Sequence, residues 1–234
     1  MRELKTREKY TSFYYENTEL PEVAIDPKTT ALLIVNMQNE FVLRDFGEAL
    51  EFKAAGVWED WVPFHDRLDD IVIPNNVKLL EFFREKRLTV TFGRIACYRE
   101  DGDDRSPVQR SDGWNNTLMP ISSYAAQVID ELTPDPNEVV VNRTTDSVTA
   151  GANYLQLLRF MGVKHVVVTG IITDQSVAST VRGLADDGYH VICVEDACAA
   201  GSMELHDAEL KIMNVIYCDV LSTDETIALI GENL

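Results

Sequence analysis

Residues 166–177 read VVVTGIITDQSV and set the fold class of this 234-residue chain. Three consecutive valines are typical of a strand that is buried on both faces. The pattern of residues 174–187 predicts a helix, and Gly188 follows it at the position where a left-handed cap is common. A buried strand that leads directly into a helix is the unit from which parallel α/β sheets are built.

The same alternation continues on both sides of this unit. It predicts a single α/β domain, a three-layer doubly wound fold with a mainly parallel six-stranded sheet and helices on both faces. We expect the chain to divide into an N-terminal arm, residues 1–28, and this domain, residues 29–234. The arm is expected to pack on the domain or on a neighbouring subunit. Strands are predicted at residues 31–35, 88–92, 139–141, 166–168, 191–194 and 215–217, and helices at 75–86, 122–132, 151–161, 174–187, 203–213 and 223–231.

Composition excludes several classes of partner. The formal net charge of −18 argues against binding to nucleic acid or to an anionic membrane. No apolar run reaches the roughly 18 residues that suggest a membrane span. The four cysteines lack the spacing of a metal site. They are typical of reduced thiols, so we expect a cytoplasmic protein.

Two long segments, residues 42–70 and 94–120, interrupt the alternation. Excursions of this length in a compact domain are usually functional or interfacial. Both follow predicted strands, so both should leave the carboxyl edge of the sheet, where open α/β folds bind their ligands.

Three segments should meet at that edge: residues 34–41 (IVNMQNEF), residues 141–147 (VNRTTDS) and the turn at residues 170–177. Together they resemble the isochorismatase-like cysteine hydrolases, and the resemblance runs from about residue 29 to the C-terminus. In that family the corresponding positions hold an Asp, a Lys and a nucleophilic Cys. Here they hold Asn36, Arg143 and Ser176, which we take as the candidate catalytic residues.

The resemblance implies a reaction as well as a fold. In the family, a thiolate attacks the carbonyl of an amide, a ureide or a similar group. Backbone N–H groups of the turn bind the oxyanion, beside a cis peptide bond that would lie between Ile171 and Ile172. Family members usually assemble, so we expect a homo-oligomer. The one Asp and two His that bind a metal in nicotinamidases have no counterpart here, and we predict neither a metal nor a cofactor.

The residues present do not allow the thiol mechanism. A serine hydroxyl needs a base to remove its proton. Neither the Asn36 amide nor the Arg143 guanidinium can serve as that base. His65 could reach the pocket from the first long segment, or could be an ordinary loop histidine. We therefore expect no proton acceptor beside Ser176, which is a nucleophile, a ligand hydrogen-bond donor or a residue that satisfies amides at a helix start.

Arg143 is expected to be buried and to need an anionic partner, because an unpaired buried guanidinium is costly. Asp146 and Asp174 are candidates within the protein, and a ligand carboxylate is the alternative. The second choice implies a small-molecule ligand that is either an acid, and so anionic, or a molecule with an acidic or strongly polarised carbonyl. The candidate substrate-binding residues are Ile172, Gln38, Phe41, Arg94, Tyr98 and Trp114. The aromatic residues of the long segments, including Trp58 and Trp61, could instead form oligomer contacts.

Two classes of function remain open at this point. In the first, the chain is a divergent enzyme that converts a small amide, ureide or isochorismate-like acid without a thiol. In the second, it is a catalytically silent pseudoenzyme that binds a metabolite or a protein partner.

Overall fold

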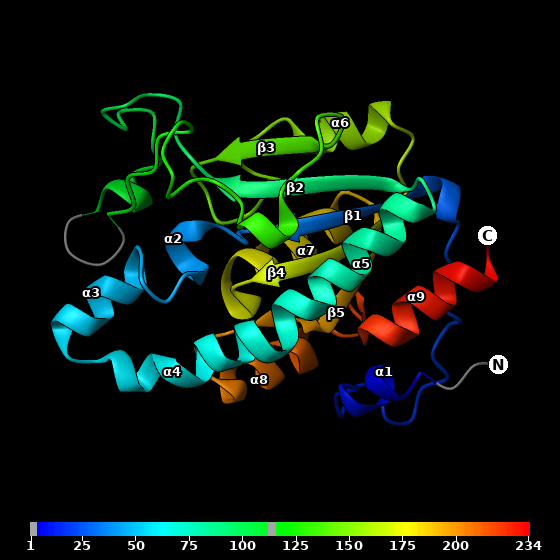
Figure 1. Ribbon diagram of the computed structural model, residues 1–234. Coiled ribbons are helices and arrows are strands. Elements are labelled where there is room, and N and C mark those ends of the chain that lie inside the picture. Colours follow the sequence, from blue (N-terminus) through cyan, green and yellow to red (C-terminus); the bar gives the residue numbers. More distant parts are fainter. Residues whose placement is uncertain (1–3, 112–115) are drawn as a thin grey trace.

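Residues 4–111 and 116–234 are described by a computed structural model, in which six parallel strands form one sheet (Figure 1). The strand order is β3-β2-β1-β4-β5-β6, with every neighbouring pair parallel. This confirms the predicted class of fold. The strands are β1 Thr30–Val35, β2 Thr89–Ile95, β3 Val139–Arg143, β4 His165–Ile171, β5 His190–Ala199 and β6 Asp219–Leu221.

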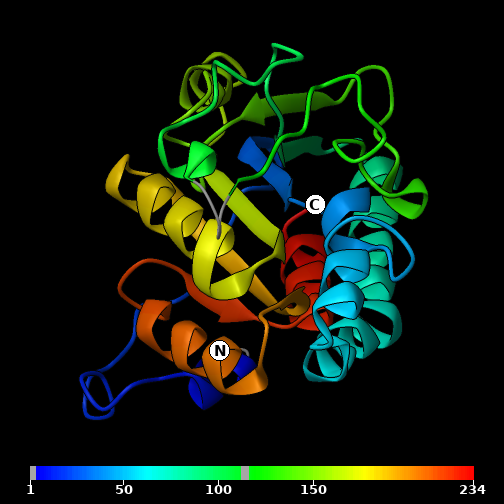
Figure 2. The same cartoon turned by 90° about the vertical axis from the view of Figure 1, so that its left-hand side faces the viewer.

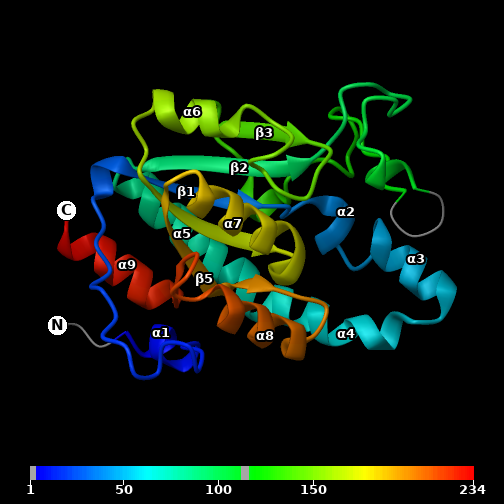
Figure 3. The ribbon, with the colours of Figure 1, turned by 180° about the vertical axis from the view of Figure 1, so that it is seen from behind.

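Helices cover both faces of the sheet, as Figure 2 shows from the end of the strands. One face carries α5 and α9, and the opposite face carries α6, α7 and α8, which are nearest the viewer in Figure 3. The helices are α1 Lys5–Lys9, α2 Asn39–Val42, α3 Glu48–Ala55, α4 Trp58–Arg67, α5 Ile73–Glu85, α6 Tyr154–Phe160, α7 Ala178–Asp186, α8 Met203–Met213 and α9 Thr223–Glu232.

The side-chain alternation of the strands divides the core into two clusters. Leu32 and Ile34 of β1 point to the cluster under α5 and α9. Leu33 and Val35 point to the cluster under α6, α7 and α8. Because both faces of β1 are fully buried, its sequence is a continuous apolar run.

The first long segment is largely helical. It forms α3 and α4, and a π-helical turn, Leu68–Val72, joins α4 to α5. We call this segment, residues 42–70, the insertion. Asn76, near the start of α5, connects the π-helical turn after the insertion to the sheet. Its Nδ2 donates to the carbonyl oxygens of Val72 at 2.8 Å and Ala197 at 2.9 Å, and its Oδ1 accepts from Thr169 Oγ1 at 2.6 Å.

Two predicted elements are wrong. Residues 122–132 do not form a helix and contain only a short 3-10 turn, Asp130–Leu132. The backbone of this segment pairs with the chain after β1 instead, with Asn39 N–H donating to Gln127 O at 2.9 Å and Ile129 N–H to Met37 O at 3.0 Å. These tertiary hydrogen bonds compete with helix formation.

Residues 215–217 are likewise not a strand. Val215 has a φ of 76° and its N–H donates to Cys218 O, which makes a turn after α8. Pairing with β5 starts only at Asp219.

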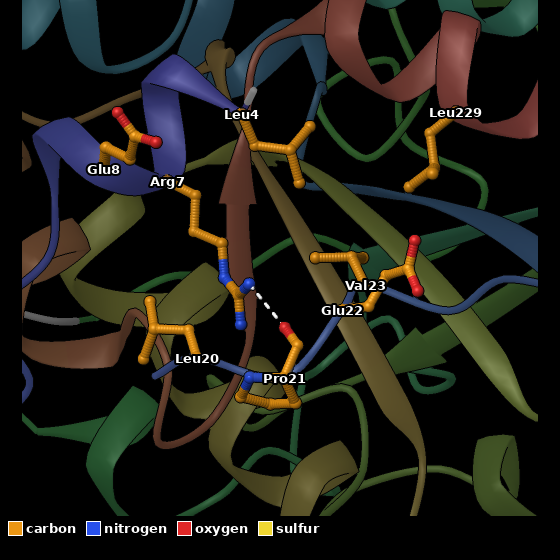
Figure 4. A pocket seen from close by; sticks show the side chains of 8 residues that line it. All are labelled: Leu4, Arg7, Glu8, Leu20, Pro21, Glu22, Val23 and Leu229. Carbon is orange, nitrogen blue, oxygen red and sulfur yellow. Dashed lines mark hydrogen bonds between the residues drawn. The ribbon is translucent and has the colours of Figure 1, made fainter. Parts of the chain in front are cut away.

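The N-terminal arm packs on the domain at the amino edge of the sheet. Arg7 of α1 forms an ion pair with Asp219 at 2.7 Å and donates to Pro21 O at 2.8 Å. A cavity of about 280 Å³ lies between the arm and α9 (Figure 4). The described part of the arm, from Leu4 onward, lies at the end of the sheet opposite the strand arrowheads (Figure 1). None of the described helices is long and apolar enough to cross a membrane.

The bonds of Asn76 lead to a prediction about stability. Asn76→Ala removes three hydrogen bonds from a fully buried site and leaves the Val72 and Ala197 carbonyl groups without this donor. Since a buried polar group left unsatisfied costs about 1–3 kcal/mol, we expect the free energy of unfolding to fall by roughly 2–5 kcal/mol. Urea denaturation measures the loss. The exposed Asn233→Ala is the control, expected to change stability by at most about 0.5 kcal/mol. An equal effect of both variants would contradict the role given to Asn76.

Candidate active site

Strand ends at the carboxyl edge bring the three predicted catalytic residues together. Asn36 follows β1 directly and has a φ of 52°, a left-handed conformation that Asn tolerates better than most residues. Arg143 is the last residue of β3, and Ser176 lies in the π-helical turn Thr173–Val177 between β4 and α7. Gly170 has a φ of 106°, and a Cβ there would lie 2.0 Å from Val35 O. Only glycine therefore lets β4 approach β1 this closely beside Asn36.

A directional chain of hydrogen bonds joins the three side chains. Arg143 donates from NH2 to Asn36 Oδ1 at 2.8 Å, and Asn36 Nδ2 donates to Ser176 Oγ at 2.9 Å. A guanidinium has no acceptor, so the Asn36 oxygen must face it and the Asn36 nitrogen must face the serine. The orientation of the amide is thus fixed by its neighbour. Because Ser176 Oγ accepts from Asn36, its own hydrogen is available for another partner.

That other partner is a carboxylate. Ser176 Oγ lies 3.3 Å from Asp146 Oδ1, toward which its hydroxyl donates. The contact is longer than the 2.5–3.0 Å of a typical O–H···O bond, as is common for catalytic hydrogen bonds in ligand-free sites. The expectation that no proton acceptor lies beside Ser176 is therefore wrong. The loop after β3 places one there, and sequence spacing does not reveal the path of that loop.

Arg143 is buried, with a residue exposure of 1%, but its partners differ from those expected. It donates to the main-chain oxygen of Asp146, from Nε at 3.2 Å and from NH2 at 2.9 Å, and its NH1 has no hydrogen-bond partner among the described residues. Among the described residues, no ion pair joins the Arg143 guanidinium to the carboxylate of Asp146 or Asp174. Burial lowers the pKa of Arg143 to about 9, and the nearby charge of Asp146 opposes the shift. The guanidinium is therefore still a cation at neutral pH.

A cavity of about 80 Å³ opens beside Ser176. This exceeds the roughly 10–15 Å³ that one water molecule needs, so a small molecule can enter. The described residues that line it are Asn36, Phe41, Glu48, Ile95, Gln109, Thr117, Asp146, Ile171, Ile172, Gln175 and Ser176. Glu48 opens α3 in the inserted segment, and burial, with the charges of Glu40 and Glu51, raises its pKa to about 7.

The turn that carries Ser176 is held by His206 of α8. The Ile171–Ile172 peptide bond is cis, as the resemblance predicts. Thr173 Oγ1 lies 2.8 Å from His206 Nδ1, and Arg67 NH2 lies 3.2 Å from His206 Nε2. Because the guanidinium can only donate, Nε2 accepts and the Nδ1 proton is directed at Thr173. His206 thus links α4 of the insertion to the turn.

Some of the predicted binding residues line the cavity beside Ser176 and others do not. Ile172 and Phe41 line the cavity. Gln38 is fully buried and binds the main chain of Ile95 instead. Its Oε1 accepts from the Ile95 N–H at 2.8 Å, and its Nε2 donates to the Ile95 carbonyl oxygen at 2.8 Å. Arg94 bonds Asn142 Oδ1 at 2.6 Å and lines a different hollow.

The remaining aromatic and imidazole candidates also lie away from this cavity or cannot be placed. Tyr98 is 66% exposed and is not part of the described lining, and Trp114 falls outside the described residues. Trp61 stacks on Phe52 with ring centroids 4.3 Å apart. His65 is buried against Trp58 and Phe64, so it does not reach Ser176, and burial lowers its pKa.

Sequence reasoning missed two acids of the site. Asp146 was considered only as a partner for Arg143, and Glu48 was one of many acids in the first long segment. The useful signal for Asp146 is its position in the loop directly after β3, at the same sheet edge as Asn36. Within residues 4–111 and 116–234, no group of three or more His, Cys, Asp or Glu side chains is arranged to hold a metal ion.

Comparison with other proteins places this chain in a family. An isochorismatase domain matches residues 30–225, so the chain belongs to the isochorismatase family. Among curated relatives, a ureidoacrylate amidohydrolase of Pseudomonas syringae pv. syringae is 28% identical over 85% of this chain and 82% of its own length. An uncharacterised isochorismatase family protein of Bacillus subtilis is 24% identical over 84% of this chain and 94% of its own length.

Solved structures agree on the fold. A cysteine hydrolase from Pseudomonas syringae pv. phaseolicola superposes with a TM-score of 0.77 at 20% identity, over 93% of this chain and all of its own. An N-carbamoylsarcosine amidase from Thermoplasma acidophilum has a TM-score of 0.63 at 25% identity, over 84% of this chain and 97% of its own.

The raised pKa of Glu48 predicts how stability depends on pH. The folded state holds this proton up to about pH 7, whereas an unfolded glutamate loses it near 4.5. Stability is therefore lost as the pH rises through this window. Glu48→Gln keeps a neutral group, so we expect it to be more stable than the wild type by roughly 1–3 kcal/mol at pH 8 and nearly equal at pH 4.5.

Urea denaturation at the two pH values measures this difference. The exposed Glu59→Gln on α4 is the matched control and should show no such change. A stability difference for Glu48→Gln that is the same at both pH values would show that the Glu48 carboxyl is not perturbed.

Proposed function

We propose that this chain hydrolyses a C–N bond of a small amide or ureide, with Ser176 Oγ as the nucleophile and Asp146 as the proton acceptor. The observation that carries the proposal is the pair of contacts made by Oγ. It accepts from Asn36 Nδ2 at 2.9 Å, and its hydroxyl is directed at Asp146 Oδ1 at 3.3 Å. The names of an amidohydrolase and an amidase among its relatives support the same class of reaction.

The first half of the reaction forms an acyl-serine. Ser176 Oγ attacks the carbonyl carbon while its proton passes to Asp146. The C–N bond of the tetrahedral intermediate then breaks, and the leaving nitrogen takes the proton back from Asp146 as it departs, which leaves Asp146 ionised again. Asn36 stabilises the developing alkoxide by donating to Oγ, and Arg143 keeps the Asn36 amide in that orientation.

The second half releases the product. A water molecule attacks the acyl carbon as its proton passes to Asp146, and Asp146 then returns this proton to Ser176 Oγ as the C–O bond to the serine breaks. Gln109, Thr117 and Gln175 line the cavity and supply hydrogen-bond donors for the carbonyl oxygen of the substrate.

A binding protein without turnover is the second candidate. The 3.3 Å separation and the exposure of Asp146 favour it, because a well-solvated carboxylate with a long hydrogen bond is a weak base for a hydroxyl. The same cavity would then hold the ligand without conversion.

Turnover by variants distinguishes the two candidates. Ammonia release is measured with acetamide, propionamide, N-carbamoylglycine and N-carbamoylglycinamide. We expect Ser176→Ala to lower kcat by at least about 10³-fold, and Asp146→Asn to lower it by about 10²–10⁴-fold, the usual contribution of a general base. Ser179→Ala, on the same helical run, is the control and should keep kcat within about twofold.

Two results would contradict hydrolysis by this serine. One is ammonia release by the wild type that does not exceed that of Ser176→Ala. The other is an Asp146→Asn variant with unchanged kcat, which would remove Asp146 from the mechanism.

A further inference from the structure

The ionisable residues in the described lining of the cavity are both acids. Glu48 and Asp146 are both part of the wall beside Ser176, and the described lining contains no Lys, Arg or His. The nearest buried cation, Arg143, is not part of this lining, and its guanidinium donates to Asn36 and to the main-chain oxygen of Asp146. It is thus placed to offset the charge of Asp146 and does not belong to the described lining of the cavity.

Glu48 is left without a counter-charge. No ion pair involves it among the described residues, and the acids nearest to it are Glu40 of α2 and Glu51 of α3. Asp146 lines the same cavity. A carboxylate ligand would add a further negative charge between these groups, whereas an N–H group or an ammonium would be attracted by them.

We propose that Glu48 selects the substrate of this site, which is a small amide or ureide that carries no carboxylate and presents an N–H or ammonium group to the Glu48 side chain. This selectivity specifies the substrate of the proposed hydrolysis. Its effect on turnover rests on the proposed function, whereas its effect on binding does not. It also differs from the anionic ligand expected from Arg143 alone. The Glu48 carboxyl belongs to the insertion, so the selection is made by a segment outside the α/β alternation.

A matched pair of compounds tests the selection without requiring catalysis. N-carbamoylglycinamide and N-carbamoylglycine differ only in an amide against a carboxylate. Their dissociation constants are measured by calorimetry on Ser176→Ala protein at pH 8. We expect the neutral compound to bind at least tenfold more tightly. The preference should shrink at pH 5.5, where Glu48 holds its proton but the carboxylate of N-carbamoylglycine is still ionised.

Glu48→Gln in the same Ser176→Ala background tests the residue itself. We expect the preference to fall to within threefold, because the variant keeps the shape of the side chain and removes its charge. Glu51→Gln is the control, since Glu51 belongs to the same helix but not to the cavity lining, and it should change the preference by less than twofold. In serine-containing protein the effect of Glu48→Gln should appear in KM more than in kcat.

The inference fails if N-carbamoylglycine binds as tightly as its amide, if Glu48→Gln leaves the preference unchanged, or if neither compound binds. A failure of the proposed hydrolysis would look different, because the neutral compound would bind with the stated preference but release no ammonia.

Discussion

Arg143 is a buried cation beside Ser176, almost fully shielded from water. The orientation of the neighbouring polar side chains follows from its charge. The guanidinium can only donate, so it sets the orientation of the Asn36 amide, and Asn36 in turn donates to Ser176 Oγ. The serine hydrogen is then directed to Asp146, whose main-chain oxygen binds the same guanidinium. A buried cation at one strand end thus orders three other residues, which come from a second strand end, one loop and one turn. Its own cost of burial is visible in the lowered pKa of Arg143.

The scaffold is that of the isochorismatase family, and the polar residues around Ser176 depart from the pattern that the resemblance implies. The resemblance to the cysteine hydrolases implies an acid at the end of β1 and a cation at the end of β3. Here the strand end after β1 holds an amide, and the carboxylate comes from the loop after β3. Arg143 and Asp146 therefore lie three residues apart on the same segment. The Asn36 amide accepts from the guanidinium and donates to Ser176 Oγ.

Much of this could be predicted from the sequence, because apolar runs and glycine caps are local signals. The six-stranded sheet, the meeting of Asn36, Arg143 and Ser176 and the cis bond at Ile171–Ile172 followed from strand ends and from the family resemblance. The segment at residues 122–132 was misassigned because its backbone bonds are made with residues 37–40, which a local pattern does not contain. Asp146 and Glu48 were missed for a related reason. One lies in an irregular loop and the other in an insertion, and the positions of such segments depend on tertiary contacts like those of Asn76 and Arg67.

The central claim is that Asp146 activates the hydroxyl of Ser176, and covalent labelling with a fluorophosphonate tests it most directly. This reagent reacts with activated serines, and intact-mass measurement followed by peptide mapping locates the adduct. The account predicts a single adduct on Ser176, formed at least about tenfold more slowly in Asp146→Asn, in line with the contribution of a general base. Labelling of Ser176 at the same rate in both proteins, or no labelling of Ser176 at all, would contradict it.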